Sequence, residues 1–376
     1  MFPRMNFRDS LIAIASVALT VFTPLVFSVF AWHSSFFYDG AYMFYRYAYN
    51  LHHVHAIVWN QNGPHTYGTT SLPWMLIVTA FSYLPLSPVI VLPLASSLFF
   101  IAAAVLLAYG LSKNARSPIF QNFWHIFLAL VLSLVSSVPF LYSVTNGMET
   151  MLSFLMNASI CLLTWKFIQE DRNYKWIVVL ACSSFVAYLV RPESGICDLL
   201  TPALAMFLFE RKDKISKILS FWSITATCIL LQLFACRLYF GTALPLSFYI
   251  KSTGMMRSAN SFTPSWEMNF YAFLGLIAIY LIVIFLVGHR RNWRVLTAYF
   301  LPAFLTFLYL TRVVQISGDY GRYYSPFLPY FMVPAFFVLD EYFDKKIPIP
   351  HKEILFRFLL VFVIAGLASE AYGGEI

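Results

Sequence analysis

Charged residues are scarce in this chain of 376 amino acids, at 11% of the total, whereas an ordinary soluble domain has about 25%. Hydrophobic residues make up 60% of the sequence. A helix that spans a membrane needs about 20 predominantly apolar residues, and nearly the whole chain divides into runs of that kind. We therefore expect an integral membrane protein of the all-α class, a polytopic bundle of about 11–12 transmembrane helices in which residues 1–376 form a single domain.

Several signatures of soluble enzymes are also missing. The sequence contains no P-loop, no GxGxxG and no GxSxG, so nucleotide-driven and serine-hydrolase mechanisms have no support. No CxxC spacing occurs either. The five cysteines lie in or at the edges of apolar runs, which predicts small core residues and not disulfides or metal ligands: Cys161, Cys182, Cys197, Cys228 and Cys236.

The net charge of +8 does not indicate a nucleic-acid partner. The basic residues fall in small clusters at the ends of apolar runs, within residues 4–8, 113–116, 166–175, 211–217, 290–294 and 345–352. Such clusters mark cytoplasmic loops of membrane proteins. The segments between the clusters are then hairpins whose tips face outward, and a first loop at residues 33–70 lies on the same side. The four hairpin tips are VPFLYSVTNGME, VRPES, residues 241–267 and QISGDYGR.

Residues 71–111 leave two alternatives open. They hold two apolar runs, split at PLSP, and two full crossings would place Lys113 and Arg116 on the outer side. Either the first run is not a full crossing, or this basic pair violates the rule.

The first loop carries the most informative acid, Asp39, directly before Gly40. Asp-Gly is a favoured turn pair, and in a purely structural interpretation the carboxylate caps the following helix. The functional alternative is a catalytic carboxylate at the membrane surface. Aromatic rings of the run YMFYRYAY, such as Tyr42, are either an interfacial belt or a lining for sugars.

Other charged residues fall on the same predicted face. They include three that suit binding of a phosphate, namely Arg322, Lys251 and Arg191, and three acids, namely Glu149, Glu193 and Asp319. Glu149 alternatively serves as a first-turn acid of a helix, and Arg191 with Glu193 as a structural ion pair. Together the charges suit a reaction in which an acid deprotonates a hydroxyl while cations stabilise a departing phosphate.

A metal site is an alternative that the histidines raise. His52 and His55 would share a face at i, i+3 if that stretch is helical, and Asp39 would supply an oxygen. Interfacial histidines are the simpler interpretation. The sequence requires no cofactor, and a divalent metal stays open.

Five ordered motifs resemble one family. DGAYMFYRYAYNL, VWNQNG and GTTSLPW resemble the first outer loop of the GT-C polyprenyl-phosphate-dependent glycosyltransferases, especially the mycobacterial terminal arabinofuranosyltransferases and their bacterial relatives. NGMET is similar to a GLET-like motif, VRPES to TRPEG, PLSFYIK to PNSFYxK, and SGDYGRYYSPFLP to GGDxxxxRFLLPxLP. The resemblance covers residues 38–330.

The resemblance implies a GT-C-type fold with short helices in the first loop, and a role for each matching residue. Asp39 falls on the first acid of the family's acidic pair and would be the catalytic base. The remaining matches are Arg46, Glu149, Arg191, Glu193, Lys251, Asp319 and Arg322. Two positions depart from the pattern. Gly40 stands where the family has its second acid, which puts a two-carboxylate or metal mechanism in doubt, and Tyr67 replaces another acid.

The expected function is transfer of a sugar, such as a pentofuranose, with inversion. The donor would be polyprenyl-phosphate-linked sugar, and the acceptor an extracytoplasmic glycan, lipid or protein. We expect the protein among the lipids of a bacterial inner (plasma) membrane, with its active site on the extracytoplasmic face. Two alternatives remain: a transporter or flippase of lipid-linked sugar, and an inactive relative that acts as a binding subunit. Transporters usually have internal repeats and a midplane site, and the sequence shows no repeat.

Overall fold

The computed structural model describes residues 39–135, 138–169, 173–210, 212–252, 290–310 and 323–344, and every regular element in these ranges is a helix, as predicted. The α-helices are α2 (Asp39–Val54), α3 (Leu72–Phe81), α4 (Pro88–Asn114), α5 (Phe123–Val135), α6 (Val138–Thr145), α7 (Thr150–Gln169), α8 (Tyr174–Val190), α9 (Gly195–Phe209), α10 (Lys214–Phe240), α11 (Leu246–Ser252), α13 (Arg290–Leu310) and α14 (Pro329–Asp344). Short 3₁₀ turns occur at η1 (Pro118–Phe120), η2 (Pro192–Ser194) and η4 (Ser325–Phe327).

Four helices in these ranges are long and apolar enough to cross a membrane: Pro88–Asn114, Thr150–Gln169, Lys214–Phe240 and Trp293–Leu310. A helix satisfies its own backbone hydrogen bonds, so an apolar run of this length can span lipid only in this form. The length and composition of these helices support the prediction of a membrane protein. The predicted total of 11–12 spans and the GT-C type stay predictions.

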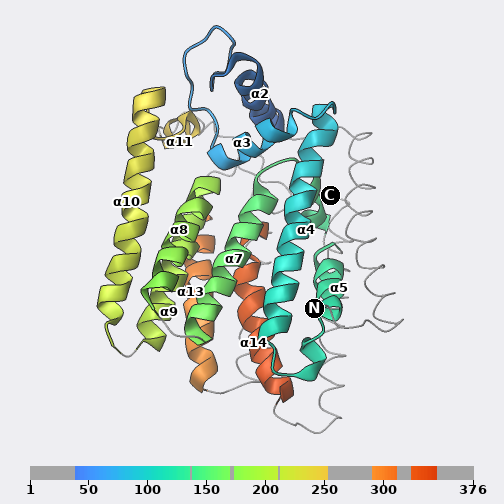
Figure 1. Ribbon diagram of the computed structural model, residues 1–376, viewed down its shortest axis with the longest axis vertical. Helices are drawn as coiled ribbons and strands as arrows, with labels where there is room; N and C mark the ends of the chain where they lie inside the picture. Colours follow the sequence, from blue (N-terminus) through green and yellow to red (C-terminus); the bar gives the residue numbers. More distant parts are fainter. Residues whose placement is uncertain are drawn as a thin grey trace.

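Helix α7 is the central helix of the bundle. It packs against α4, α8, α9 and α14, while α10 lies at the edge and packs on α8 and α9 (Figure 1). Aromatic side chains fill the core between the helices. Trp165 of α7 stacks on Phe337 of α14 with ring centroids 3.7 Å apart, and Phe140 meets Phe154 edge to face at 5.3 Å.

The cysteine prediction holds only in part. Cys161, Cys197 and Cys236 are buried, Cys228 is half-buried, and Cys182 is exposed on α8. Cys182 faces outward because the core side of α8 is formed by other residues, among them Leu180, Ala181 and Ser184.

Helix α3 decides between the two alternatives for residues 71–111. It has 10 residues, which corresponds to about 15 Å, half of the roughly 30 Å hydrocarbon core. Ser71 caps its start by accepting a hydrogen bond from the Trp74 amide at 3.3 Å. Helix α4, with 27 residues, is the crossing helix. The first apolar run is therefore not a full crossing, and Lys113 keeps to the rule.

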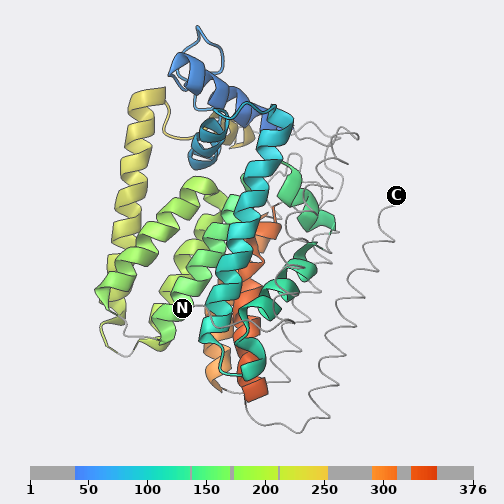
Figure 2. The same cartoon turned by 45° about the vertical axis from the view of Figure 1, so that its right-hand side comes forward.

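The two ends of the bundle differ in character. Helices α2, α3 and α11 gather at one end, which we call the α2 end (Figures 1 and 2). Helices α4 and α7 finish at the opposite end with Lys113 and Lys166 in their last turns, and α10 begins there with Lys214. We call this the basic end. The hairpin tips at 146–149, 191–194 and 241–245 all lie at the α2 end, as predicted, whereas QISGDYGR lies outside the described ranges.

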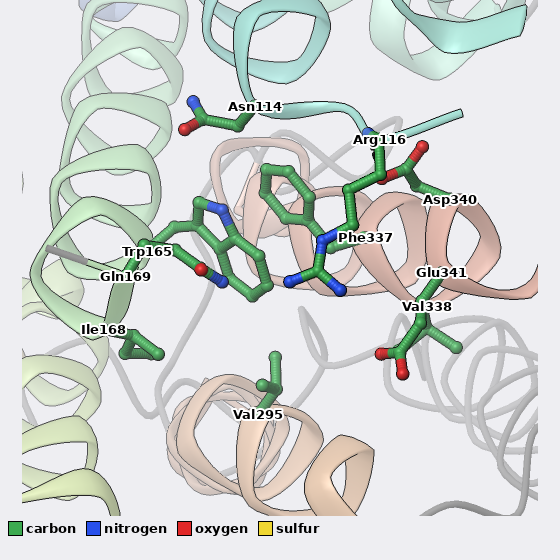
Figure 3. Close-up of a pocket in the computed structure, with 10 residues that line it drawn as sticks. All are labelled: Asn114, Arg116, Trp165, Ile168, Gln169, Val295, Phe337, Val338, Asp340 and Glu341. Atoms are coloured by element: carbon green, nitrogen blue, oxygen red, sulfur yellow. Dashed lines mark hydrogen bonds between the residues drawn. The ribbon is translucent and has the colours of Figure 1, made fainter. Parts of the chain in front are cut away.

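At the basic end, one carboxylate joins distant parts of the chain. Asp340 of α14 accepts hydrogen bonds from the backbone amides of Arg116 at 2.8 Å and Ser117 at 2.9 Å. A cavity of about 100 Å³ lies beside this link, and Figure 3 shows the Arg116 side chain extending into it between Trp165 and Glu341. This space suits a few water molecules.

Candidate functional site

Helix α2 begins against the NGMET segment. A Cβ atom at Gly40 would lie 3.1 Å from Met148 Cε, and one at Gly147 would lie 2.7 Å from Leu92 Cβ of α4. Gly147 also has φ of +71°, a conformation that glycine adopts readily. The segment thus passes tightly between α2 and α4. Met148 takes the space beside residue 40, where the family pattern has its second acid.

A buried ion pair joins NGMET to VRPES. Arg191 Nε lies 3.7 Å from Glu149 Oε1, and Arg191 Nη2 lies 3.5 Å from Glu193 Oε1. The Arg191 and Glu149 side chains are only 3% and 6% exposed, whereas Glu193 is 25% exposed. The guanidinium also lies 5.0 Å from the centre of the Tyr323 ring, a cation–π distance. Charges buried to this degree need such partners.

Polar atoms around the start of α7 are incompletely satisfied. Among the described residues, Asn146 Nδ2, Glu149 Oε2 and Thr150 Oγ1 are buried and have no hydrogen-bond partner. Buried polar groups are normally paired, so three unpaired atoms in five consecutive residues indicate a place for a polar ligand or water. The amide and hydroxyl can donate hydrogen bonds to an oxygen of a ligand, and the carboxylate can accept one from a hydroxyl.

Two further contacts join the last motif to α6 and α7. Asn157 Nδ2 donates to the Pro326 carbonyl at 2.7 Å, and Ser143 Oγ lies 3.4 Å from Ser325 Oγ. The described part of SGDYGRYYSPFLP therefore packs beside NGMET and VRPES. Asp319 and Arg322 lie outside the described residues.

The PLSFYIK motif, which contains Lys251, lies at the same end of the bundle and contacts the loop that follows α2. Helix α11 contains Lys251, and its first residue, Leu246, donates its amide to the Tyr67 carbonyl at 2.8 Å. Burial raises the pKa of the Tyr67 phenol, so this residue stays neutral where the family pattern has an acid. The structure describes the backbone of Asp39 and Lys251 and not their side chains.

Arg46 and Tyr42 do not join the ion pair. Arg46 donates from Nε to the Trp59 carbonyl and from an Nη atom to Asn60 Oδ1, both at 2.9 Å, and lies 4.3 Å from the centre of the Trp59 ring. Its contacts therefore hold the loop that follows α2. Tyr42 is 40% exposed on α2.

The histidine pair that suggested a metal is not formed. Helix α2 ends at Val54, and His55 has φ of +56°, so His52 and His55 do not share a helix face. His52 instead packs on the Tyr83 ring at 3.7 Å, and His53 stacks on Tyr49 at 3.9 Å. The ranges that the structure describes hold no group of three His, Cys, Asp or Glu side chains able to bind a metal ion.

Sequence reasoning missed two buried acids, Asp198 and the Asp340 described above. Asp198 of α9 is fully buried and accepts a hydrogen bond from the Tyr330 hydroxyl of α14, and its own carbonyl accepts one from Ser184 of α8. Its Oδ2 has no partner in the described part of the chain. The available signal was an acid inside the apolar run ICDLL, because intramembrane acids are rare and default to a functional hypothesis.

Comparison with known proteins assigns the chain to no family. No protein-family model matches this chain, and neither the curated proteins nor the solved structures with which it was compared include a match.

Proposed function

We propose that this protein is an integral membrane glycosyltransferase of GT-C type. It transfers a sugar, such as a pentofuranose, from a polyprenyl-phosphate carrier to an extracytoplasmic glycan, lipid or protein, with inversion at the anomeric carbon. One observation carries the proposal: motif segments far apart in the sequence, NGMET, VRPES and YYSPFLP, pack together around the start of α7, beside the first residues of α2.

In this proposal, Asp39 is the base that takes the proton from the acceptor hydroxyl. The acceptor oxygen then attacks the anomeric carbon, the bond from that carbon to the phosphate oxygen breaks, and polyprenyl phosphate leaves as an anion. Arg191, Lys251 and Arg322 neutralise it. Glu149 and Glu193 hold Arg191 in place. The wider set of proposed substrate-binding residues comprises Arg46, Tyr42, Glu149, Glu193 and Asp319.

The charge pattern supports the proposed location. Basic clusters are typical of the cytoplasmic side of a membrane protein, and they gather at the end opposite to α2, which favours a proposed position of the α2 end on the extracytoplasmic side of a bacterial inner membrane. A lipid-linked donor would reach this end with its phosphate at the membrane surface and its prenyl chain in the bilayer.

The test follows a labelled sugar from its polyprenyl-phosphate carrier, in membranes that hold matched amounts of wild type or Asp39→Asn. Asp344→Asn is the matched control, because Asp344 is an exposed acid at the opposite end, the end of α14. We expect wild type and the control to consume the carrier and Asp39→Asn to lose the activity. Equal consumption by all three would show that Asp39 is not the base.

One observation favours a second candidate, a transporter of lipid-linked sugar. Asp198 is a fully buried acid among packed helices, and such acids often line pathways. The transporter would move the carrier between leaflets without consuming it. An inactive binding subunit would bind the carrier, and would do so equally well with Asp39→Asn.

A further inference from the structure

A neutral groove lies at the α2 end, apart from the ion pair. Its volume is about 480 Å³, within the range of about 300–1,000 Å³ that is usual for small-molecule sites. Met43 and Tyr47 of α2 form one wall, Trp59 and Asn60 a second, and Leu246 and Ser247 of α11 a third. No acidic or basic side chain is among its described lining residues. The groove therefore suits an uncharged ligand.

Two side chains of α2 hold the wall formed by Trp59 and Asn60 in place. Arg46 holds the Trp59 carbonyl, the Asn60 side chain and the Trp59 ring. Asn50 donates from Nδ2 to the carbonyls of Val58 at 2.8 Å and Trp59 at 3.0 Å. Two side chains of α2 thus make four hydrogen bonds to residues 58–60. A wall held in this way loses little conformational entropy when a ligand binds.

Two glycines bring the backbone close to the groove. Gly63 and Gly68 both line it, and a Cβ atom at Gly68 would collide with the Tyr47 hydroxyl. Burial raises the pKa of the Tyr47 phenol above its ordinary value, so this wall stays neutral as well. The Cβ positions of both glycines are already taken by protein atoms, those of Tyr47 at Gly68 and those of Asn60 at Gly63, so the absence of a side chain lets the walls pack tightly.

The chemistry of the walls selects a class of ligand. Trp59 is 38% exposed, and its ring lies 5.6 Å from the Tyr47 ring at an angle of 56°. The exposed Trp59 ring, backed by the buried Tyr47 ring, lies in the same groove as the amide side chain of Asn60, so the groove offers an apolar face and a hydrogen-bonding group. A sugar ring has the same combination, since its C–H faces are apolar and its hydroxyls are polar and uncharged.

We infer that this groove binds an uncharged sugar unit of the acceptor glycan. Met43 stands four residues after Asp39 in α2, about 6 Å along the helix axis, so the groove starts one helical turn from the proposed base. The assignment to the acceptor rests on the proposed function, whereas sugar binding by the groove does not. Among acceptors, a glycan is selected over a bare lipid.

Other occupants fit less well. A prenyl or acyl chain would be expected along the membrane-facing sides of the helices. The residues that line this groove belong instead to α2, its following loop and α11. These elements lie at one end of the bundle (Figures 1 and 2). A charged peptide would meet no opposite charge in the described lining.

The test measures binding and not turnover. Purified full-length protein is mixed with neutral linear tetrasaccharides of arabinofuranose, galactofuranose, mannopyranose and glucopyranose at millimolar concentration, and saturation-transfer NMR reports contact with each sugar. We expect at least one to bind wild type, Trp59→Phe to retain binding, and Trp59→Ala to weaken it about tenfold, the usual effect of losing an aromatic anchor. Trp293→Ala is the matched control, an exposed tryptophan at the start of α13.

The outcomes separate this inference from the proposed function. If no tetrasaccharide binds wild type, or if Trp59→Ala binds as wild type does while its thermal unfolding is unchanged, the inference is wrong, and sugar transfer by wild type would still support the enzyme. If binding depends on Trp59 but no carrier is consumed, the groove is a glycan site and the transferase proposal fails. If a prenyl alcohol displaces the bound sugar from the groove, the assignment to a glycan is overturned.

Discussion

Removing one partner of the buried ion pair between Arg191 and Glu149 should be strongly destabilising, and Arg191→Met tests this. At 3.7 Å and an effective dielectric constant of about 20, the attraction is about 4 kcal/mol before desolvation is subtracted. Arg191→Met leaves the Glu149 carboxylate buried without its cation, which costs about 3–5 kcal/mol. At roughly 2 °C per kcal/mol, the midpoint of thermal unfolding in detergent should fall by roughly 6–10 °C.

A double-mutant cycle isolates the pair from other effects of the substitutions. Glu149→Gln should cost less than Arg191→Met, because Arg191 keeps Glu193 at 3.5 Å. The double variant should recover part of the loss, since the buried charge and its partner leave together, and a coupling energy of about 1–3 kcal/mol is expected. Additive effects of the two substitutions would refute the interaction, and so would an unchanged midpoint for Arg191→Met alone.

Two further predictions concern packing and a backbone link. Gly147→Ala should lower the midpoint of thermal unfolding by several degrees, because the left-handed backbone and the nearby Leu92 leave no room for a Cβ atom. Gly195→Ala is the control in the same assay and should change the midpoint little, since the nearest atom to its Cβ position is 3.7 Å away. Asp340→Leu removes the acceptor of two buried or part-buried backbone amides and should lower the free energy of unfolding by about 2–4 kcal/mol. Asp340→Asn should lower it less, because the amide oxygen of asparagine still accepts one hydrogen bond. A higher thermal midpoint for the Leu variant than for the Asn variant would contradict this account.

The long apolar helices could be predicted from hydropathy, because a chain segment in lipid must satisfy its own backbone hydrogen bonds and a single apolar run does so only as a helix. Helix α3 could not, since hydropathy measures how apolar a run is and not whether its ends reach both surfaces. The start of this helix is marked by its cap Ser71 and by Pro73 in the first turn, but its end at Phe81 depends on how the chain turns into α4.

The candidate site divides in the same way. The basic clusters predicted which way each helix runs, and from this the sequence predicted that Glu149 and Arg191 lie at the same end of the bundle. That they form a pair depends on the packing of α7 against α8, which no local pattern contains. Arg46 matched the family pattern, but its contacts with Trp59 became apparent only with the fold of the loop. Asp198 acquires its partner, Tyr330, from 132 residues further along the chain.

The link from Asp340 to the turn after α4 has a consequence for biosynthesis. The acceptor is made 224 residues after the amide of Arg116. At about 5–20 residues per second, the ribosome needs roughly 10–45 s to supply it, and throughout that time the turn must satisfy its amides with water at the membrane surface. The helices from α4 to α13 are therefore synthesised before this end of the bundle can be closed. A chain stalled before α14 would present an open, hydrated end to the insertion and quality-control machinery.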